Sequence, residues 1–238
     1  CFMAERDGKH DMRKEVIILG SIVAIVIVGL VVGSNYYRSS IQSEQKPVNT
    51  GNSNRAAAGE LVRPDSPTLG AADAKVTLVE FYDPECEACA AISPIVKKIL
   101  KDYDGRIRFV ARYMPLHPSS MAAVAFTEAA GEQGKYWQAQ ELLFQKQSER
   151  GQKHGQPSAS PADINALFEK YAMEMGLDLT KLNAAIKENR FAAKIDRDKK
   201  DGQSLGVRQT PTFFVNGRQL LRLGDSELRE LIDEELRK

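Results

Sequence analysis

Three features of the sequence predict an α/β fold. A strand-like run at residues 76–82 is followed by an amphipathic helical pattern at 86–103 and a second strand-like run at 107–114. A long stretch of helical patterns comes next, and the chain then returns to strand at residues 212–215. Strand, helix and strand in this order are typical of a parallel βαβ unit, so we expect an α/β domain.

The first βαβ unit rests on the kind and spacing of its apolar residues. Residues 76–82, VTLVEFY, are rich in β-branched and aromatic side chains, and the run is long enough for a buried strand but too short for a helix. Asp83-Pro84 ends this strand. The helix that follows carries apolar side chains at intervals of three and four residues, namely Ile92, Ile95, Val96, Ile99 and Leu100.

The rest of the folded part is predicted to be helical until a closing hairpin. Helical patterns cover residues 122–130, 137–147, 164–175 and 179–198, separated by breaks that contain Gly or Pro. Asn216-Gly217 between the strand-like residues 212–215 and 218–221 is a strong signal for a tight β-hairpin. A last helix is expected at about residues 225–237.

Composition excludes some classes of function. Lys and Arg total 33 against 32 for Asp and Glu, so the chain has no overall field that would gather nucleic acid. Three cysteines are too few for a secreted scaffold held by several disulfides. The cysteine pair at positions 86 and 89 therefore needs a local explanation.

Residues 16–33 predict a transmembrane anchor, because they are apolar, uncharged and long enough to cross most of a bilayer. A cleaved signal peptide is the alternative, although its apolar region is usually shorter, about 7 to 15 residues. More basic residues precede the apolar segment than closely follow it, and those before it are Arg6, Lys9, Arg13 and Lys14. By the positive-inside rule, this excess places residues 1–15 in the cytoplasm. Residues 34–66 are polar and without apolar periodicity, so we interpret them as a flexible tether.

The motif Cys86-Glu87-Ala88-Cys89 lies between a predicted buried strand and the first turn of a helix. Backbone N–H groups and the positive end of the helix dipole stabilise a thiolate at this point. Because the thiolate is the nucleophile in disulfide exchange, we expect Cys86 to attack and Cys89, one turn deeper, to resolve the mixed disulfide. No cofactor beyond this redox-active disulfide is expected.

A metal site is the alternative reading of the pair, from a different class of function. Two thiolates could bind or deliver a soft metal such as Cu(I), whereas a zinc site usually needs four ligands. The three histidines, His10, His117 and His154, are scattered along the chain. We therefore expect no metal ligands among them. An inert structural disulfide is the remaining possibility.

Residues 80–89 with Pro94, together with residues 210–217, resemble the DsbA-type thioredoxin-fold oxidoreductases. The similarity covers roughly residues 67–238. It implies a thioredoxin fold in which a helical insertion, residues 118–204, separates the two halves of the core, residues 67–117 and 205–238.

The resemblance also has implications for the site. It implies that Thr210-Pro211 is a cis peptide bond facing the cysteines, where an extended protein substrate could pair with the backbone of Thr210 as an added strand. The expected partners are protein thiols or disulfides and a membrane redox partner that resets the pair. We expect the catalytic part to lie in the periplasm, or an equivalent extracytoplasmic space, at a bacterial inner membrane.

Glu80 is an unusual residue in its strand, because an unpaired buried carboxylate is costly. It could accept the proton of Cys89 during resolution, as the resemblance implies, or it could pair with Arg112 on the next strand. His117 is interpreted as a loop or cap residue. The charged residues 196–201 are expected to form a solvated face.

The charges around the motif give an expectation for the direction of exchange. Asp83, Glu85 and Glu87 bring three carboxylates within a few residues of Cys86, and negative charge opposes a thiolate. We therefore expect a Cys86 pKa above that of the strongly oxidising members of the family. This expectation favours reductase or isomerase activity over oxidase activity, without excluding either.

Overall fold

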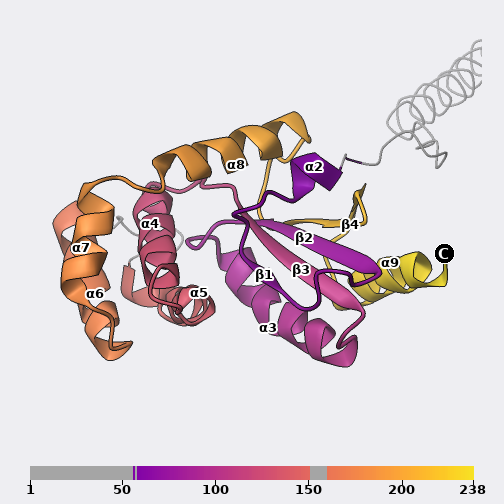
Figure 1. Ribbon diagram of the computed structural model, residues 1–238, viewed down its shortest axis with the longest axis horizontal. Coiled ribbons are helices and arrows are strands. Elements are labelled where there is room, and N and C mark those ends of the chain that lie inside the picture. Colours follow the sequence, from indigo (N-terminus) through magenta and orange to yellow (C-terminus); the bar gives the residue numbers. More distant parts are fainter. Residues whose placement is uncertain (1–55, 57, 151–159) are drawn as a thin grey trace, which may run out of the picture. The chain divides into compact units, whose positions relative to one another are not determined.

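A mixed five-stranded sheet forms the centre of the computed structural model, which describes residue 56 and residues 58–150 and 160–238 (Figure 1). The strand order is β1-β3-β2-β4-β5, and the bounds are β1 Thr68–Leu69, β2 Val76–Tyr82, β3 Ile107–Tyr113, β4 Thr212–Val215 and β5 Arg218–Gln219. β2 is parallel to β3 and antiparallel to β4. The predicted α/β class and the first βαβ unit are confirmed.

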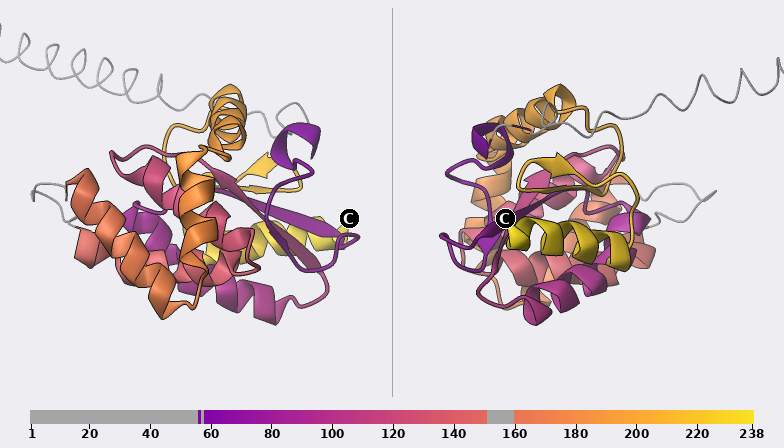
Figure 2. Two further views of the ribbon diagram at one scale, coloured as in Figure 1. Left: turned by 60° about the vertical axis from the view of Figure 1, so that its left-hand side comes forward. Right: turned by 90° about the vertical axis from the view of Figure 1, so that its right-hand side faces the viewer.

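Helices cover both faces of this sheet, as the two views of Figure 2 show. α3 (Glu87–Asp102) and α9 (Asp225–Arg237) lie on one face, and α2 (Ala58–Leu61) and α8 (Ala192–Ser204) lie on the other. Side chains of a strand alternate between the faces. In β2, Leu78 and Tyr82 therefore pack in the cluster with α3, while Phe81 packs in the cluster with α2.

A helical insertion lies between β3 and β4 in sequence and beside one end of the sheet in space (Figure 1). Its helices before α8 are α4 Ser120–Gly131, α5 Tyr136–Gln145, the 3-10 helix η1 Gln147–Arg150, α6 Pro161–Glu174 and α7 Leu179–Lys187. Three buried tyrosines join it to the sheet: the hydroxyl of Tyr136 lies 2.9 Å from that of Tyr82 and 2.8 Å from that of Tyr113.

One predicted helix is wrong in extent. Residues 179–198 were expected to be continuous, but the structure divides them into α7 and the start of α8. The break contains Asn189, whose φ of 53° is left-handed. Asparagine is among the few residues that adopt this conformation readily, so apolar spacing alone did not reveal the turn.

The closing hairpin is confirmed, with a shorter second strand than predicted. Asn216 and Gly217 have φ values of 46° and 85°, the left-handed pair that a tight hairpin turn of this kind requires. β5 ends at Gln219, two residues before the predicted end. The chain then leaves the sheet, and Leu221 is 79% exposed.

The prediction that residues 196–201 form a solvated face is wrong for Asp198 and Asp201, although Asp196 and Lys200 are exposed. Asp198 is completely buried, and its Oδ1 lies 3.0 Å from Nη2 of Arg112. The same Nη2 lies 2.5 Å from Oδ2 of Asp201, which also receives a hydrogen bond from Arg63. α8 therefore turns two carboxylates toward a buried guanidinium on β3, a partner that sequence spacing does not reveal.

The predicted cytoplasmic segment, the transmembrane anchor and most of the tether lie outside the described residues. In the part that the structure describes, no helix is both long and apolar enough to cross a membrane. The last part of the sequence assigned to the tether packs on the sheet. Leu61 is buried, and Arg112 donates hydrogen bonds of 2.8 Å to the carbonyl oxygens of Glu60 and Leu61.

Candidate active site

The two cysteines lie where β2 passes into α3. Cys86 is the N-cap residue of α3, with φ −79° and ψ 120°, and its N–H donates a hydrogen bond of 3.1 Å to the carbonyl of Asp83. Both cysteines are free thiols. Cys89 is completely buried in the first turn, whereas Cys86 is 8% exposed. The arrangement therefore makes Cys86 the more accessible sulfur.

The environments of the two sulfurs shift their pKa values in opposite directions. The pKa of Cys86 is lowered to about 5, and the largest cause is a hydrogen bond from the Cys89 thiol. Burial opposes this shift, whereas hydrogen bonds from the Thr210 side chain and from the backbone N–H groups of Ala88 and Cys89 contribute to it. Burial raises the pKa of Cys89 well above its ordinary value. Cys86 is thus ionised at neutral pH while Cys89 holds its proton.

The predicted cis peptide bond is present between Thr210 and Pro211, immediately before β4. The carbonyl oxygen of Thr210 lies 3.2 Å from Sγ of Cys86 and accepts a hydrogen bond from it when Cys86 is in its thiol form. Residues that are 124 positions apart in the sequence are thereby brought together. The described structure thus places Thr210 and Pro211 beside the reactive sulfur, as the resemblance implied.

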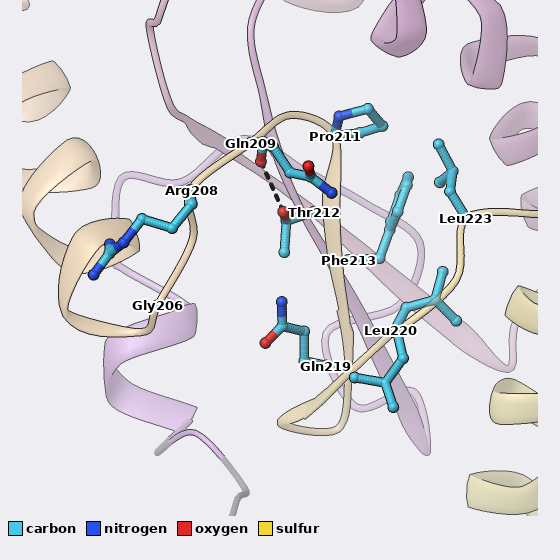
Figure 3. A pocket seen from close by; sticks show the side chains of 10 residues that line it. Gly206, Arg208, Gln209, Pro211, Thr212, Phe213, Gln219, Leu220 and Leu223 are labelled. Carbon is cyan, nitrogen blue, oxygen red and sulfur yellow. Dashed lines mark hydrogen bonds between the residues drawn. The ribbon is translucent and has the colours of Figure 1, made fainter. Parts of the chain in front are cut away.

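Pro211 also lines a cavity of about 250 Å³ (Figure 3). It is lined by Gly206, Arg208, Gln209, Pro211, Thr212, Phe213, Gln219, Leu220, Leu221 and Leu223. The hydroxyl of Thr212 donates a hydrogen bond of 2.7 Å to the carbonyl of Gln209, which closes the loop before β4. Leu221 and Leu223 are exposed at this cavity, as are Arg208, Gln209 and Gln219, so its mouth carries both apolar and polar side chains.

Asp83 organises the loop that leads to Cys86, a role that sequence reasoning missed. Its buried carboxylate accepts hydrogen bonds from the N–H of Glu85 at 2.9 Å, the N–H of Leu116 at 2.7 Å and the hydroxyl of Ser120 at 2.6 Å. Nδ1 of His117 lies 2.8 Å from the same carboxylate. His117 is accordingly a loop residue before α4, as predicted. The sequence signal for this role was the Asp83-Pro84 pair directly after the end of β2.

Two of the three carboxylates expected to repel the Cys86 thiolate, Asp83 and Glu85, have hydrogen-bond or ion-pair partners in the fold. The expected rank of the Cys86 pKa among family members stays a prediction. Asp83 is surrounded by hydrogen-bond donors, and Oε1 of Glu85 lies 2.8 Å from Nε of Arg150. Burial also raises the pKa of Glu85. Only Glu87 points to solvent. A linear count of charges missed Ser120 and Arg150, because these two partners come from the helical insertion.

Glu80 lies on the face of β2 that carries α3 and the cysteines. Burial raises its pKa to about 8, and the charge of Cys86 acts in the same direction. Among the described residues its Oε1 has no hydrogen-bond partner. Arg112 aligns with Phe81 rather than Glu80 and lies over the Phe81 ring on the opposite face. The alternative that Glu80 pairs with Arg112 is therefore wrong, and its role in proton transfer stays a prediction.

The described residues contain no group of three or more His, Cys, Asp or Glu side chains arranged to hold a metal ion. The candidate site brings together two sulfurs, one buried carboxyl group and the loop of Thr210 and Pro211. These side chains come from β2, α3 and the segment before β4.

Comparisons with known proteins agree with this arrangement. A sequence profile described as Thioredoxin matches residues 63–234. The chain is 37% identical over 153 residues to the Na(+)/H(+) antiporter NhaA 3 of Salinispora tropica, covering 63% of this chain and 21% of that protein. It therefore spans about a fifth of the length of the first curated relatives it matches.

Two further relatives match over most of their own length. Disulfide bond formation protein D of Bacillus subtilis is 30% identical, with 77% of this chain and 83% of that protein covered. The crystal structure of oxidised BdbD from Bacillus subtilis superposes with a TM-score of 0.62 at 28% identity, covering 73% of this chain and 94% of that one. The sheet, the cysteine motif and these matches lead to one conclusion: the chain belongs to the DsbA-like thioredoxin family.

Proposed function

We propose that this protein is a membrane-anchored, extracytoplasmic thiol–disulfide oxidoreductase that exchanges disulfides with protein substrates through Cys86 and Cys89. One observation carries the proposal. The accessible sulfur has a pKa lowered to about 5, whereas its buried neighbour has a raised pKa. A thiol–disulfide oxidoreductase needs this asymmetry. One sulfur must attack or leave as a thiolate, and the other must attack the mixed disulfide to form the intramolecular disulfide.

In the oxidising direction, a substrate thiolate attacks Sγ of Cys86 in the Cys86–Cys89 disulfide. The S–S bond breaks, a mixed disulfide forms, and Cys89 leaves as a thiolate that takes up one proton. A second substrate thiolate then attacks the substrate sulfur of the mixed disulfide, and Cys86 leaves as a thiolate. Two electrons pass from the substrate dithiol to the protein, and the substrate gains one disulfide.

Glu80 is proposed as the group that exchanges a proton with Cys89. Its pKa of about 8 keeps the carboxyl group protonated at neutral pH, so it can supply a proton to the departing Cys89 thiolate. In the reverse direction the carboxylate accepts the proton of Cys89 as that sulfur attacks. The electrostatic influence of Glu80 on Cys89 supports this assignment.

The Cys86 environment favours the oxidising direction. A stabilised thiolate stabilises the reduced protein, so its disulfide is a stronger oxidant, and a sulfur with a low pKa is also a good leaving group. This reverses the preference for reductase or isomerase activity that followed from counting carboxylates. We therefore propose that the protein donates disulfides, and that a membrane redox partner reoxidises the pair.

The substrate is proposed to lie as an extended segment along the loop of Thr210 and Pro211. Pairing with the backbone of Thr210 would bring a substrate cysteine to Cys86. The exposed side chains of Leu221 and Leu223, which line the same cavity as Pro211, offer contact for apolar side chains on either side of that cysteine. Protein thiols are therefore the proposed substrate class.

Trapping experiments test the catalytic assignment. Cys89→Ser should accumulate mixed disulfides with cellular proteins, because Cys86 still attacks or is attacked but nothing releases the substrate. Cys86→Ser should accumulate none, because the remaining sulfur is buried. Non-reducing gels of acid-quenched cells make the comparison. Equal trapping by both variants would contradict the assigned roles.

The anchor is tested separately. A reporter fused after Tyr37 should be active outside the cytoplasm, and the protein should remain in the membrane fraction at its full mass. Recovery of a soluble form that begins near Ser34 would instead indicate a cleaved signal peptide.

A further inference from the structure

The 3-10 helix η1 (Gln147–Arg150) touches the loop that carries Cys86. Nε2 of Gln147 donates hydrogen bonds to the carbonyl oxygen of Pro84 at 2.9 Å and to that of Cys86 at 3.0 Å. Both hydrogen bonds are buried, and Gln147 itself is 9% exposed. One side-chain amide thus joins two backbone carbonyls on either side of Glu85.

Arg150 makes a second connection from the same helix. Its side chain is completely buried, and its Nε lies 2.8 Å from Oε1 of the equally buried Glu85. Its Nη2 donates to the carbonyl oxygen of Leu143 at 2.7 Å, which fixes the guanidinium to the end of α5, and to that of Pro84 at 3.4 Å. Every residue from Pro84 to Cys86 therefore has a contact with η1.

These contacts act on the groups that orient Cys86. The peptide group after Cys86 flanks the cysteine directly, so the hydrogen bond from Gln147 to the Cys86 carbonyl acts on its ψ of 120°. The peptide group after Pro84 precedes Glu85, so the hydrogen bond to the Pro84 carbonyl holds the residue that leads into the cysteine. This N-cap conformation lets the N–H groups of Ala88 and Cys89 reach the Cys86 sulfur. If the two carbonyls were free to turn, the sulfur would sample positions away from those donors.

A purely structural role would not require polar groups here. A buried ion pair is often no better for stability than apolar side chains of similar volume, because both charges lose their hydration. Arg150 and Glu85 are buried together, and one atom of each, Nη1 and Oε2, has no hydrogen-bond partner among the described residues. Their placement against the active-site loop indicates that they hold the loop rather than fill space.

We propose that Gln147 and Arg150 are positioning residues, through which the helical insertion holds Cys86 in the conformation that makes it the nucleophile. The inference rests on the proposed function, because it concerns the same sulfur. It adds a role for the insertion: the thioredoxin core carries both cysteines, but η1 sets the reactivity of the first.

The test compares Gln147→Met and Gln147→Glu with the wild-type protein. Methionine keeps the length of the side chain without a donor, and glutamate places a carboxylate oxygen where the amide N–H₂ stood. Both variants should raise the midpoint of Cys86 ionisation, followed by thiolate ultraviolet absorbance against pH. The rate of alkylation near that midpoint should fall by about threefold to tenfold, the effect of one or two lost hydrogen bonds.

The matched control is Glu149→Gln in the same 3-10 helix. Glu149 contacts Tyr171, Lys146 and Lys170 instead of the active-site loop. This variant should leave both the ionisation midpoint and the alkylation rate unchanged. A double variant, Glu85→Gln with Arg150→Met, removes the ion pair without leaving a lone buried charge, and it should shift the midpoint upward like Gln147→Met.

The outcomes separate this inference from the proposed function. If folded Gln147→Met and Gln147→Glu both keep the wild-type midpoint, the inference is overturned. If the Gln147 variants do not fold, the double variant decides by the same measurement. Failure of the wild-type protein to exchange disulfides with a thiol-containing peptide would overturn the proposed function, whereas the ionisation midpoint would still report on Gln147 and Arg150.

Discussion

Glu80→Gln should stabilise the protein, and the gain should grow with pH. The carboxyl group has an ordinary pKa of 4.5 in the unfolded chain and a pKa of about 8 when buried in the native state. Between these values the native protein holds a proton that the unfolded chain has lost. Stability of the wild-type protein therefore falls as pH rises through this window, and a neutral glutamine removes the loss.

The magnitude follows from the width of the window. Each pH unit above 4.5 costs about 1.4 kcal/mol of unfolding free energy until the native group ionises near pH 8. The variant should therefore match the wild type near pH 4.5 and exceed it by roughly 3 kcal/mol at pH 7. The gain should level off above about pH 8 at roughly 5 kcal/mol.

Cys86 contributes in the opposite direction. Its pKa falls from 9.0 to about 5 on folding, so the reduced native state loses its proton before the unfolded chain does, and stability rises with pH between these values. The two titrations offset each other in the wild-type protein. A pH series of the wild-type protein alone would therefore hide the contribution of Glu80 to the unfolding free energy. Subtracting the wild-type unfolding free energy from that of Glu80→Gln at each pH cancels most of the Cys86 contribution, which both proteins share.

The assay is denaturant unfolding of the reduced wild-type and variant proteins at pH 5, 6, 7 and 8, with the same comparison in a Cys86→Ser background. Glu87→Gln is the control, because this carboxylate is exposed in the first turn of α3, and it should change stability by less than about 0.5 kcal/mol. A difference between Glu80→Gln and wild type that stays constant from pH 5 to 8 would refute the reasoning, since Glu80 would then not change its proton binding on folding.

Two further predictions follow from the buried groups. In Cys89→Ala the ionisation midpoint of Cys86 should rise above about 5, because the hydrogen bond from the Cys89 thiol is the largest influence that lowers the Cys86 pKa. Cys89→Ser should raise the midpoint less, because its hydroxyl can still donate a hydrogen bond. The alkylation rate of Cys86 measured against pH gives the midpoint of both variants. Arg112→Met should cost about 3 to 5 kcal/mol of unfolding free energy, because Asp198 stays buried without its ion-pair partner. Arg108→Met on the same strand is the control for denaturant unfolding, and an equal loss in both variants would contradict the importance of the buried pair.

The sequence alone was sufficient for the parts of the fold that depend on local pattern. The strand of residues 76–82, the helix that begins after Cys86 and the Asn216-Gly217 turn all follow from apolar spacing and backbone preference. The cysteine motif was recognisable for the same reason, since both sulfurs lie within one helical turn. The resemblance then supplied Thr210 and Pro211, which no local pattern connects to the cysteines.

What only the tertiary structure decided is which charged groups face each other. Counting carboxylates around Cys86 predicted repulsion, but Asp83 and Glu85 find donors on α4 and η1. The charge pattern of residues 196–201 predicts a solvated face, but Asp198 and Asp201 lie against the buried guanidinium of Arg112. Electrostatic energy depends on distance and burial in space, and sequence spacing does not report either quantity for groups brought together by folding. Charge pairing, and with it the reactivity of Cys86, is therefore a property of the assembled fold.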